Sequence, residues 1–309
     1  MSPATTPART LGVLALAGAL CLGGCSVTAA PKQASNPPAS TSPSSASLPL
    51  AAAVDQFRDG YASGTIVLQL TDTGGAPFTV VRAELDDPRF AGGTVWTGST
   101  DFTTGQTTSL PAVAAAPRCS GPAGTASAGT ADRSPDGAPS VVVRLADGTE
   151  TRVAATDPHG VLARIHTEGC FAAAVASVAA LRLDDALTPG PTNGTAVLTL
   201  RVEPIPVATP PLSVSALTLS SVGGTTLLDE DPAQPWPRGV VLAPGKTVRL
   251  AVRPARCDPH AVAEDKVGTL VPLTVAMGGA SGVVKVAAPT ALRAAIYAFV
   301  ASACGWSAG

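Results

Sequence analysis

Hydrophobic and polar residues alternate with a period of two along much of this chain. In the segment 246–253, Val248, Leu250 and Val252 fall on one side of an extended chain, and Arg249 and Arg253 fall on the other. This pattern predicts a strand with one buried and one solvated face. Similar short segments, separated by Gly, Pro, Asp and Asn, recur after residue 50. The pattern therefore predicts an all-β protein with short helices.

The strand pattern also occurs twice. Matching segments follow one another in the same order: 65–70 with 195–200, 105–107 with 245–247, and Arg118-Cys119 with Arg256-Cys257. A collinear series of such matches indicates an internal duplication. We therefore expect two tandem domains, 50–173 and 174–309. Each is predicted to be an antiparallel sandwich of immunoglobulin-like type, a likeness of architecture only, since the Cys-Trp-Cys spacing of true immunoglobulin domains is absent.

Each predicted domain ends in an apolar helix. Asp157 is a typical N-cap residue, and Pro158 suits the first helical position. Pro289 opens the second helix. Its apolar side chains form one stripe, which we expect to pack on the helix's own sandwich rather than on a membrane: Leu292, Ile296, Phe299 and Ala303. Trp96 and Trp236 occupy similar places in the two domains, which favours core positions over sugar-stacking sites.

The N-terminus has three parts: Arg9 without a nearby acid, the apolar run Leu11–Leu22, and Gly23-Gly24 directly before Cys25. The run is too short to cross a bilayer core of about 30 Å and is typical of a secretory signal. These residues resemble the lipobox of bacterial lipoproteins. The resemblance implies a signal peptide at 1–24 and lipid, such as palmitate, on Cys25. It also implies a membrane anchor on the extracytoplasmic face.

A tether is predicted at 25–49. Of the 24 residues after Cys25, 19 are Ser, Thr, Pro or Ala. Such a segment buries too little apolar surface to offset its loss of entropy, so we expect disorder.

The composition limits the partners. Charged residues make up only 14% of the chain, and the formal net charge is -2, which argues against nucleic acid. The Ala, Gly, Pro and Arg bias resembles that of a high-GC bacterium such as an actinobacterium, and the segment Cys257–Lys266 resembles a recurring element of uncharacterised actinobacterial exported lipoproteins. That resemblance names no functional family.

Four cysteines remain after the signal peptide and the lipid site are set aside, and they allow three pairings. The duplication selects one of them: Cys119–Cys170 and Cys257–Cys304. An exported chain meets an oxidising space, which favours disulfides. The rival, a zinc site, lacks the usual CxxC spacing.

Catalytic signatures are absent from the sequence, including GxSxG, SxxK, HExxH and a phosphate-binding glycine loop. We therefore expect neither an enzyme nor a cofactor.

One polar loop stands out as a candidate binding site: Asp258, His260, Glu264, Asp265 and Lys266. Asp258-Pro259 predicts a capped short helix, which places His260 and Glu264 on one face. The simpler interpretation is a capped turn held by the Cys257 disulfide. The alternative is a small polar or metal site. The corresponding segment of the first domain, 120–126, carries no charge, so the fold does not require this one.

These features predict a membrane-anchored envelope lipoprotein that acts as a non-catalytic binding or structural module. Its expected partners are the membrane, through lipid, and an envelope protein or glycan. The alternative is an extracytoplasmic solute- or metal-binding lipoprotein that uses the Asp258–Lys266 loop. A hydrolase is the least favoured class.

Overall fold

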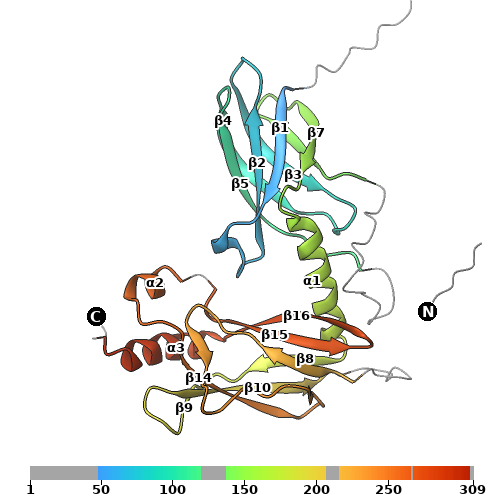
Figure 1. Cartoon of the computed structure of the whole chain (residues 1–309). Helices are drawn as coiled ribbons and strands as arrows, with labels where there is room; N and C mark the ends of the chain where they lie inside the picture. Colours follow the sequence, from blue (N-terminus) through green and yellow to red (C-terminus); the bar gives the residue numbers. More distant parts are fainter. Residues whose placement is uncertain (1–47, 120–136, 207–215, 266, 307–309) are drawn as a thin grey trace, which may run out of the picture. The chain divides into compact units, whose positions relative to one another are not determined.

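A computed structural model describes residues 48–119, 137–206, 216–265 and 267–306. These residues form mostly β-sheet, arranged in several sheets (Figure 1). Within them, no helix is long and apolar enough to cross a membrane. The signal peptide, Cys25 and nearly all of the tether lie outside the described residues.

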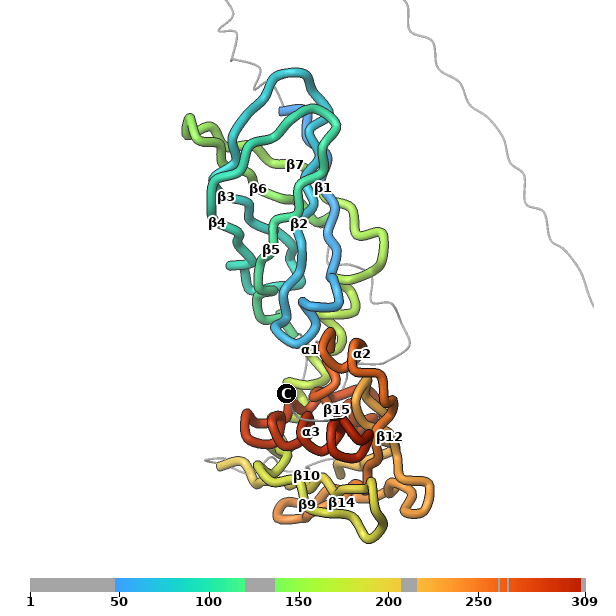
Figure 2. The backbone as a smooth tube through the Cα atoms, turned by 90° about the vertical axis from the view of Figure 1, so that its left-hand side faces the viewer, coloured from blue at the N-terminus to red at the C-terminus, as the bar shows by residue number. Residues whose placement is uncertain are grey.

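We call the described residues of 48–176 the first copy. Their elements are β1 (Leu50–Asp55), the 3-10 helix η1 (Arg58–Gly60), β2 (Thr65–Asp72), β3 (Phe78–Asp86), β4 (Val95–Phe102), β5 (Thr107–Val113), β6 (Ser140–Leu145), β7 (Glu150–Thr156) and α1 (Val161–Ala176). As described, these strands form one seven-stranded sheet in the order β4-β3-β6-β7-β1-β2-β5. Figure 2 shows β1, β2 and β5 side by side within it.

We call the described residues of 177–306 the second copy. Their elements are β8 (Ala179–Leu183), β9 (Thr188–Pro189), β10 (Ala196–Pro204), β11 (Thr218–Val222), β12 (Leu228–Glu230), β13 (Val240–Val241), β14 (Thr247–Pro254), α2 (Pro259–Ala263), β15 (Leu270–Met277), β16 (Ala280–Ala287) and α3 (Thr290–Ala303). Here the described strands form two sheets. One has the order β12-β14-β10-β8, with β9 beside β10, and the other has the order β13-β11-β15-β16.

The two copies pair their strands in the same way. The antiparallel pairs β1–β2, β2–β5, β3–β6 and β6–β7 recur as β8–β10, β10–β14, β11–β15 and β15–β16. The duplication read from the sequence therefore has a counterpart in the pairing of the strands. The domain limits 50–173 and 174–309 stay a prediction.

A glycine turn fixes which residues correspond. Gly105 has φ 79° and donates its N–H to the Asp72 carbonyl at 2.8 Å; Gly245 has φ 83° and donates to the Val202 carbonyl at 2.7 Å. Positive φ suits glycine, which has no Cβ to clash. The turn equates Asp72 with Val202.

One pairing of the first copy is not repeated in the second, and the second copy has two pairs that the first lacks, β9–β10 and β12–β14. In the first copy β1 and β7 pair in parallel, with Ala52 opposite Ala155. In the second copy their counterparts, β8 and β16, end separate sheets, and no backbone pairing joins them among the described residues. The Cα atoms of β8 and β16 nevertheless come within 8 Å of one another.

The buried side chains gather in two hydrophobic cores, and α1 contributes to both. Val161 and Leu162 belong to the first core, whereas Phe171 and Val175 belong to the second. The α1 helix thus passes through residue 173, the predicted boundary. It begins at Val161 rather than Pro158, a difference from the sequence-based expectation. Asp157 still caps it, because its carboxylate accepts the N–H groups of Val161 at 2.7 Å and Leu162 at 3.0 Å.

The α3 helix packs on its own copy, as expected, through Leu292, Ile296 and Val300, all fully buried in the second core. Trp236 belongs to the same core, and its indole N–H donates to the Ala251 carbonyl at 2.6 Å. Trp96 is partly buried against the first core.

The predicted disulfide pairing is confirmed. Cys119 bonds to Cys170 and Cys257 bonds to Cys304, each with a Cα–Cα distance of 5.4 Å. Each disulfide ties the segment after a strand, β5 or β14, to the helix that closes its copy.

Candidate functional site

The Asp258–Lys266 loop is built largely from structural contacts. Asp258 caps α2, since its carboxylate accepts the N–H of His260 at 3.0 Å. The backbone N–H of Glu264 donates to the His260 carbonyl at 3.0 Å and closes the turn. The side chains of Asp258, His260 and Glu264 are exposed. Lys266 lies outside the described residues.

Asp265 anchors the loop to the second copy. Its carboxylate accepts hydrogen bonds from the Thr226 hydroxyl and from the Tyr297 hydroxyl of α3, the latter at 3.2 Å. The Gly268 N–H donates to both carboxylate oxygens, at 2.8 and 2.9 Å. Burial, together with the nearby Asp265 charge, raises the pKa of Tyr297. Gly268 leaves the space that this arrangement needs, because a Cβ there would meet the Leu227 side chain at 2.4 Å.

These contacts agree with a capped and anchored turn. Across the described residues, no three His, Cys, Asp or Glu side chains are placed to share a metal ion. The corresponding segment of the first copy, 120–126, lies outside the described residues, so the two loops are not compared in space. A binding role for this loop stays a prediction.

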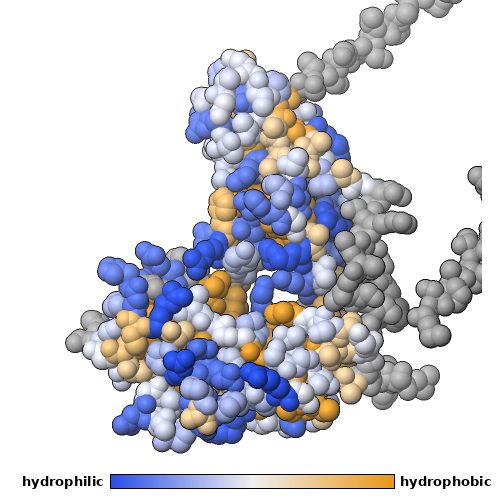
Figure 3. All heavy atoms as spheres, viewed as in Figure 1, coloured by the Kyte–Doolittle hydropathy of each residue, from blue (hydrophilic) through white to orange (hydrophobic). Residues whose placement is uncertain are grey.

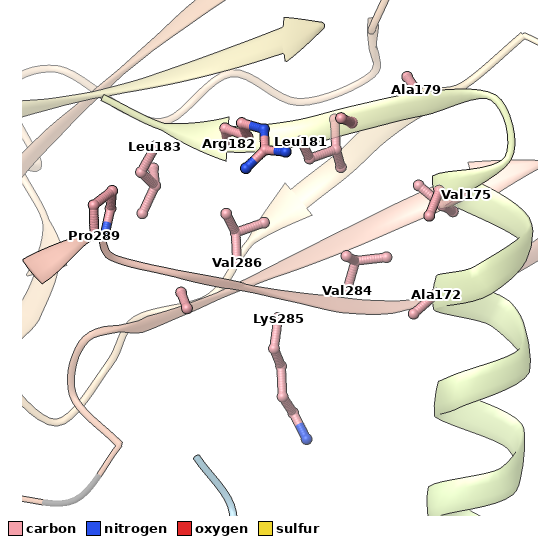
Figure 4. Close-up of a pocket in the computed structure, with 13 residues that line it drawn as sticks. Ala172, Val175, Ala179, Leu181, Arg182, Leu183, Val284, Lys285, Val286 and Pro289 are labelled. Carbon is pink, nitrogen blue, oxygen red and sulfur yellow. The ribbon is translucent and has the colours of Figure 1, made fainter. Parts of the chain in front are cut away.

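The residues that the sequence analysis missed line a groove between β8 and β16, with α1 along one side. It has a volume of about 460 Å³. Figure 4 shows Leu183 of β8 and Val286 of β16 pointing toward one another, with Val175 of α1 at the other end of the groove, on the side of Val284. The described lining is almost wholly apolar: Ala172, Val175, Ala176, Ala179–Leu183, Val284–Ala287 and Pro289. Arg182 and Lys285 are its charged members.

The residues of this groove have counterparts in the first copy. Because Leu50 faces Asp72 and Leu181 faces Val202, Ala52 corresponds to Leu183. The strand β7 ends two residues before Pro158, and β16 ends two residues before Pro289. Aligning the two prolines therefore makes Ala155 the counterpart of Val286. The groove therefore lies where the first copy pairs Ala52 with Ala155.

A second pocket, of about 340 Å³, lies between η1, α1 and β16. In Figure 3, drawn from the same side as Figure 1, this face is hollowed there, with hydrophilic and hydrophobic residues on the rim. The Glu168 carboxylate accepts a hydrogen bond from the Lys285 ammonium at 2.9 Å and lies 3.7 Å from the Arg164 guanidinium. Arg164 also donates to the Gln56 side chain at 2.6 Å and lies over the Tyr61 ring.

The charged groups of this second pocket thus satisfy one another. Two cations face one acid, and an aromatic ring covers the cations, as in ordinary cation–π contacts. This arrangement holds α1 against its neighbours and leaves no charged group without a partner among those named. The apolar groove between β8 and β16 is the stronger candidate for a binding site.

No protein-family model and no curated protein matches the chain. Among solved structures, the CupB2 chaperone of Pseudomonas aeruginosa is 13% identical over 73% of this chain and 94% of that chain, with a TM-score of 0.18. A protein of unknown function from Porphyromonas gingivalis W83 is 16% identical over 78% and 99%, with a TM-score of 0.20. Red sea bream transglutaminase is 10% identical over 78% and 31%, with a TM-score of 0.21. Likenesses at these TM-scores support neither a fold family nor an activity.

Proposed function

We propose that this chain is an exported lipoprotein, anchored through lipid on Cys25 at the outer face of the membrane. In this proposal two tandem immunoglobulin-like sandwiches form a non-catalytic binding module held off the surface by the tether. The signal-like N-terminus and the Ser/Pro/Ala-rich segment support the anchor. The two disulfides support an oxidising, extracytoplasmic location.

We place the binding element in the groove between β8 and β16. One observation carries this choice: the strand pairs of the first copy recur in the second copy except β1–β7, and where that pair is missing the second copy has an apolar groove. A fold that can close this position in one copy does not need it open in the other. Apolar concave sites of several hundred Å³ are typical of ligand binding.

The chemistry of the groove favours binding over catalysis. Its described lining contains no Ser, Cys, His, Asp or Glu. General acid–base and nucleophilic catalysis depend on such side chains or on lysine, and the one lysine of the described lining, Lys285, is paired with Glu168 at 2.9 Å.

Anchoring and binding are tested separately. Cys25→Ala should move the protein from the membrane fraction to the soluble exported fraction, because the lipid-bearing sulfur is lost. Retention of the variant on the membrane would contradict a lipid anchor at this residue.

Binding is tested with a photo-crosslinking amino acid at Ala180, which lines the groove, in whole cells. The matched position is Val241, exposed in the same copy and outside the groove lining. We expect a discrete adduct from position 180, identified by mass spectrometry, and none from position 241. Equal adducts at both positions, or none at 180, would argue against the groove as the binding element.

A further inference from the structure

The two disulfides have closely similar settings. We call Cys119–Cys170 the first disulfide and Cys257–Cys304 the second, and they close loops of similar length, with separations of 51 and 47 residues. In each, the cysteine that follows the strand is exposed, and the cysteine of the closing helix is half-buried. Each disulfide can therefore serve as a reference for the other.

The helical cysteines differ in the residue one turn before them. On α1 this residue is His166, and its Nε2 lies 3.7 Å from the Sγ of Cys170. Residues four apart lie on one face of a helix, so the spacing in the sequence produces this contact. The same position before Cys304 is Val300, which is fully buried in the second core. In the described part of the chain, no histidine side chain is hydrogen-bonded to a sulfur of the second disulfide.

The imidazole of His166 is held with an N–H close to the sulfur. Its Nε2 lies 2.9 Å from the Arg118 carbonyl, and because a carbonyl can only accept, Nε2 carries the hydrogen. The Phe90 ring packs edge-on against the imidazole, with centroids 6.3 Å apart and planes at 83°. His166 therefore holds a hydrogen-bond donor between a carbonyl oxygen and the Sγ of Cys170.

A donor at this position assists thiol–disulfide exchange. In that reaction a thiolate attacks one sulfur of a disulfide, and the rate rises as the departing sulfur becomes a better leaving group. Cys119 is the exposed member of the first disulfide, so attack there makes Cys170 the departing sulfur. The Nε2–H of His166 then stabilises the thiolate that develops on Cys170.

We infer that the first disulfide is a thiol-exchange site, whose substrate is an external thiol and whose leaving group is stabilised by His166. The external thiolate forms an S–S bond to Cys119 while the Cys119–Cys170 bond breaks, and the electron pair leaves on Cys170. A second thiolate attacks the external sulfur and releases Cys119. Two external thiols are thereby oxidised to a disulfide, and the disulfide of the protein is reduced by two electrons. The inference goes beyond the binding function proposed above and does not depend on the groove.

The structure around the site favours a reversible reaction. The segment that carries the exposed cysteine is fixed by the Arg118 N–H, which donates to the Arg89 carbonyl at 2.7 Å. A Cβ at Gly169 of α1 would meet the Pro117 side chain at 2.8 Å, so α1 packs closely on this segment. Neither contact involves the disulfide, so both should hold the two reduced cysteines close enough to be oxidised again.

The experiment uses the whole chain with Cys21→Ser and Cys25→Ser, which leaves only the four disulfide cysteines. Reduced glutathione, a small thiol, is added under native conditions, and samples are quenched by alkylation over time. Peptide mass spectrometry then measures how fast each disulfide opens and which cysteine carries glutathione. Reduced thioredoxin, a protein dithiol, is used in parallel.

We expect glutathione to attach to Cys119 and the first disulfide to open about 10-fold faster than the second, the factor that one hydrogen bond to a charged group supplies. The second disulfide is the reference within the same molecule. A preference for the first disulfide that is larger with thioredoxin than with glutathione assigns the site to protein dithiols. An equal or smaller preference assigns it to small thiols.

Replacing the histidine separates a chemical from a structural role. His166→Val, which introduces the residue type of the second copy, should slow opening of the first disulfide about 10-fold and leave the second unchanged. A purely structural histidine predicts the opposite, because loss of its bond to the Arg118 carbonyl would loosen the site and speed exchange. His159→Val, the same change at an exposed histidine of the first copy, should alter neither rate.

Three results would overturn the inference: equal opening rates of the two disulfides in the parent protein, glutathione on Cys170 instead of Cys119, or unchanged or selectively faster opening of the first disulfide in His166→Val. Unfolding of that variant would instead speed both disulfides. The decision then rests on His166→Gln, which keeps a donor for the Arg118 carbonyl but provides no imidazole. Its first disulfide must open more slowly than that of the parent protein, and an equal rate rejects the role of His166.

Discussion

The second copy repeats the strand pairs of the first copy except one, the pair β1–β7, and adds the pairs β9–β10 and β12–β14. In the first copy Ala52 and Ala155 lie opposite each other and β1 pairs with β7. In the second copy the corresponding residues are Leu183 and Val286, both buried, and the strands stay apart. We attribute the difference to size, because larger inward side chains occupy interior space that direct pairing would need. The comparison shows how one scheme yields a closed sheet in one copy and a groove in the other.

The largest expected effect comes from removing the disulfides, and it tests whether the two copies depend equally on them. Removing Cys119–Cys170 or Cys257–Cys304 by paired Cys→Ala changes should each cost about 4 kcal/mol in unfolding free energy, because the closed loops are of similar length. The sequence separations are 51 and 47 residues. Urea unfolding of the two double variants measures both costs. A large inequality between them would show that the two disulfides do not play equivalent parts in the two copies.

The next prediction transfers the residues of the second copy into the first. Ala52→Leu with Ala155→Val should cost about 1–3 kcal/mol per site through overpacking. It should also speed amide exchange at the β1–β7 boundary. Ala163→Leu, the same kind of change on an exposed position of α1, should stay within about 0.5 kcal/mol. An unchanged β1–β7 boundary would mean that side-chain size does not open the groove.

Much of this fold follows from local pattern. Alternation over 246–253 predicted a strand that the structure places at Thr247–Pro254, and the near-equal cysteine spacings predicted both disulfides. One repeated signal was passed over: Asp87-Pro88 and Asp231-Pro232. Both aspartates are buried, and each accepts the N–H two residues later, at 2.9 and 3.0 Å.

The groove was not predictable in the same way. Whether β8 pairs with β16 depends on how two strands distant in sequence are placed, which period-two alternation does not encode. The sequence analysis instead favoured the charged loop. Asp265 shows why the sequence cannot separate the two roles of such a loop, because a polar residue that anchors a turn looks the same in sequence as one that binds a ligand. The signal for the groove is that Leu183 and Val286 stand where the first copy has Ala52 and Ala155. This correspondence can be recognised only once the register of the strands is known.

A smaller effect is expected where the copies differ by one buried charge. Asp72 is fully buried, and its Oδ2 has no hydrogen-bond partner within the described chain, whereas Oδ1 accepts the Gly74 N–H at 2.8 Å. Its counterpart is Val202. Asp72→Val should stabilise the fold by about 1 kcal/mol, because the gain from removing an unsatisfied oxygen exceeds the loss of one hydrogen bond.

Urea midpoints of the Asp72 variants measure this gain. Asp72→Asn keeps an acceptor for Gly74 and should gain less than the Val variant. Lower stability of Asp72→Val than of the parent protein would indicate that the carboxylate has a stabilising partner in the folded chain.

The smallest effect is expected from Glu168, and it separates two kinds of contact between α1 and the second copy, apolar burial and an ion pair. Phe171 and Val175 are buried in the second core, and a Cβ at Gly282 of β16 would meet the Phe171 ring at 2.6 Å. Glu168 adds an ion pair with Lys285, in which both side chains are more than a third exposed. Glu168→Gln should therefore cost less than about 1 kcal/mol, and the cost should shrink as salt is raised.

Glu264→Gln, an exposed acid after α2, is the matched control and should be neutral. If Glu168→Gln instead cost several kcal/mol at every salt concentration, the ion pair rather than apolar burial would hold α1 in place. A small, salt-sensitive cost would show that burial of Phe171 and Val175, rather than the ion pair, holds α1 against the second copy.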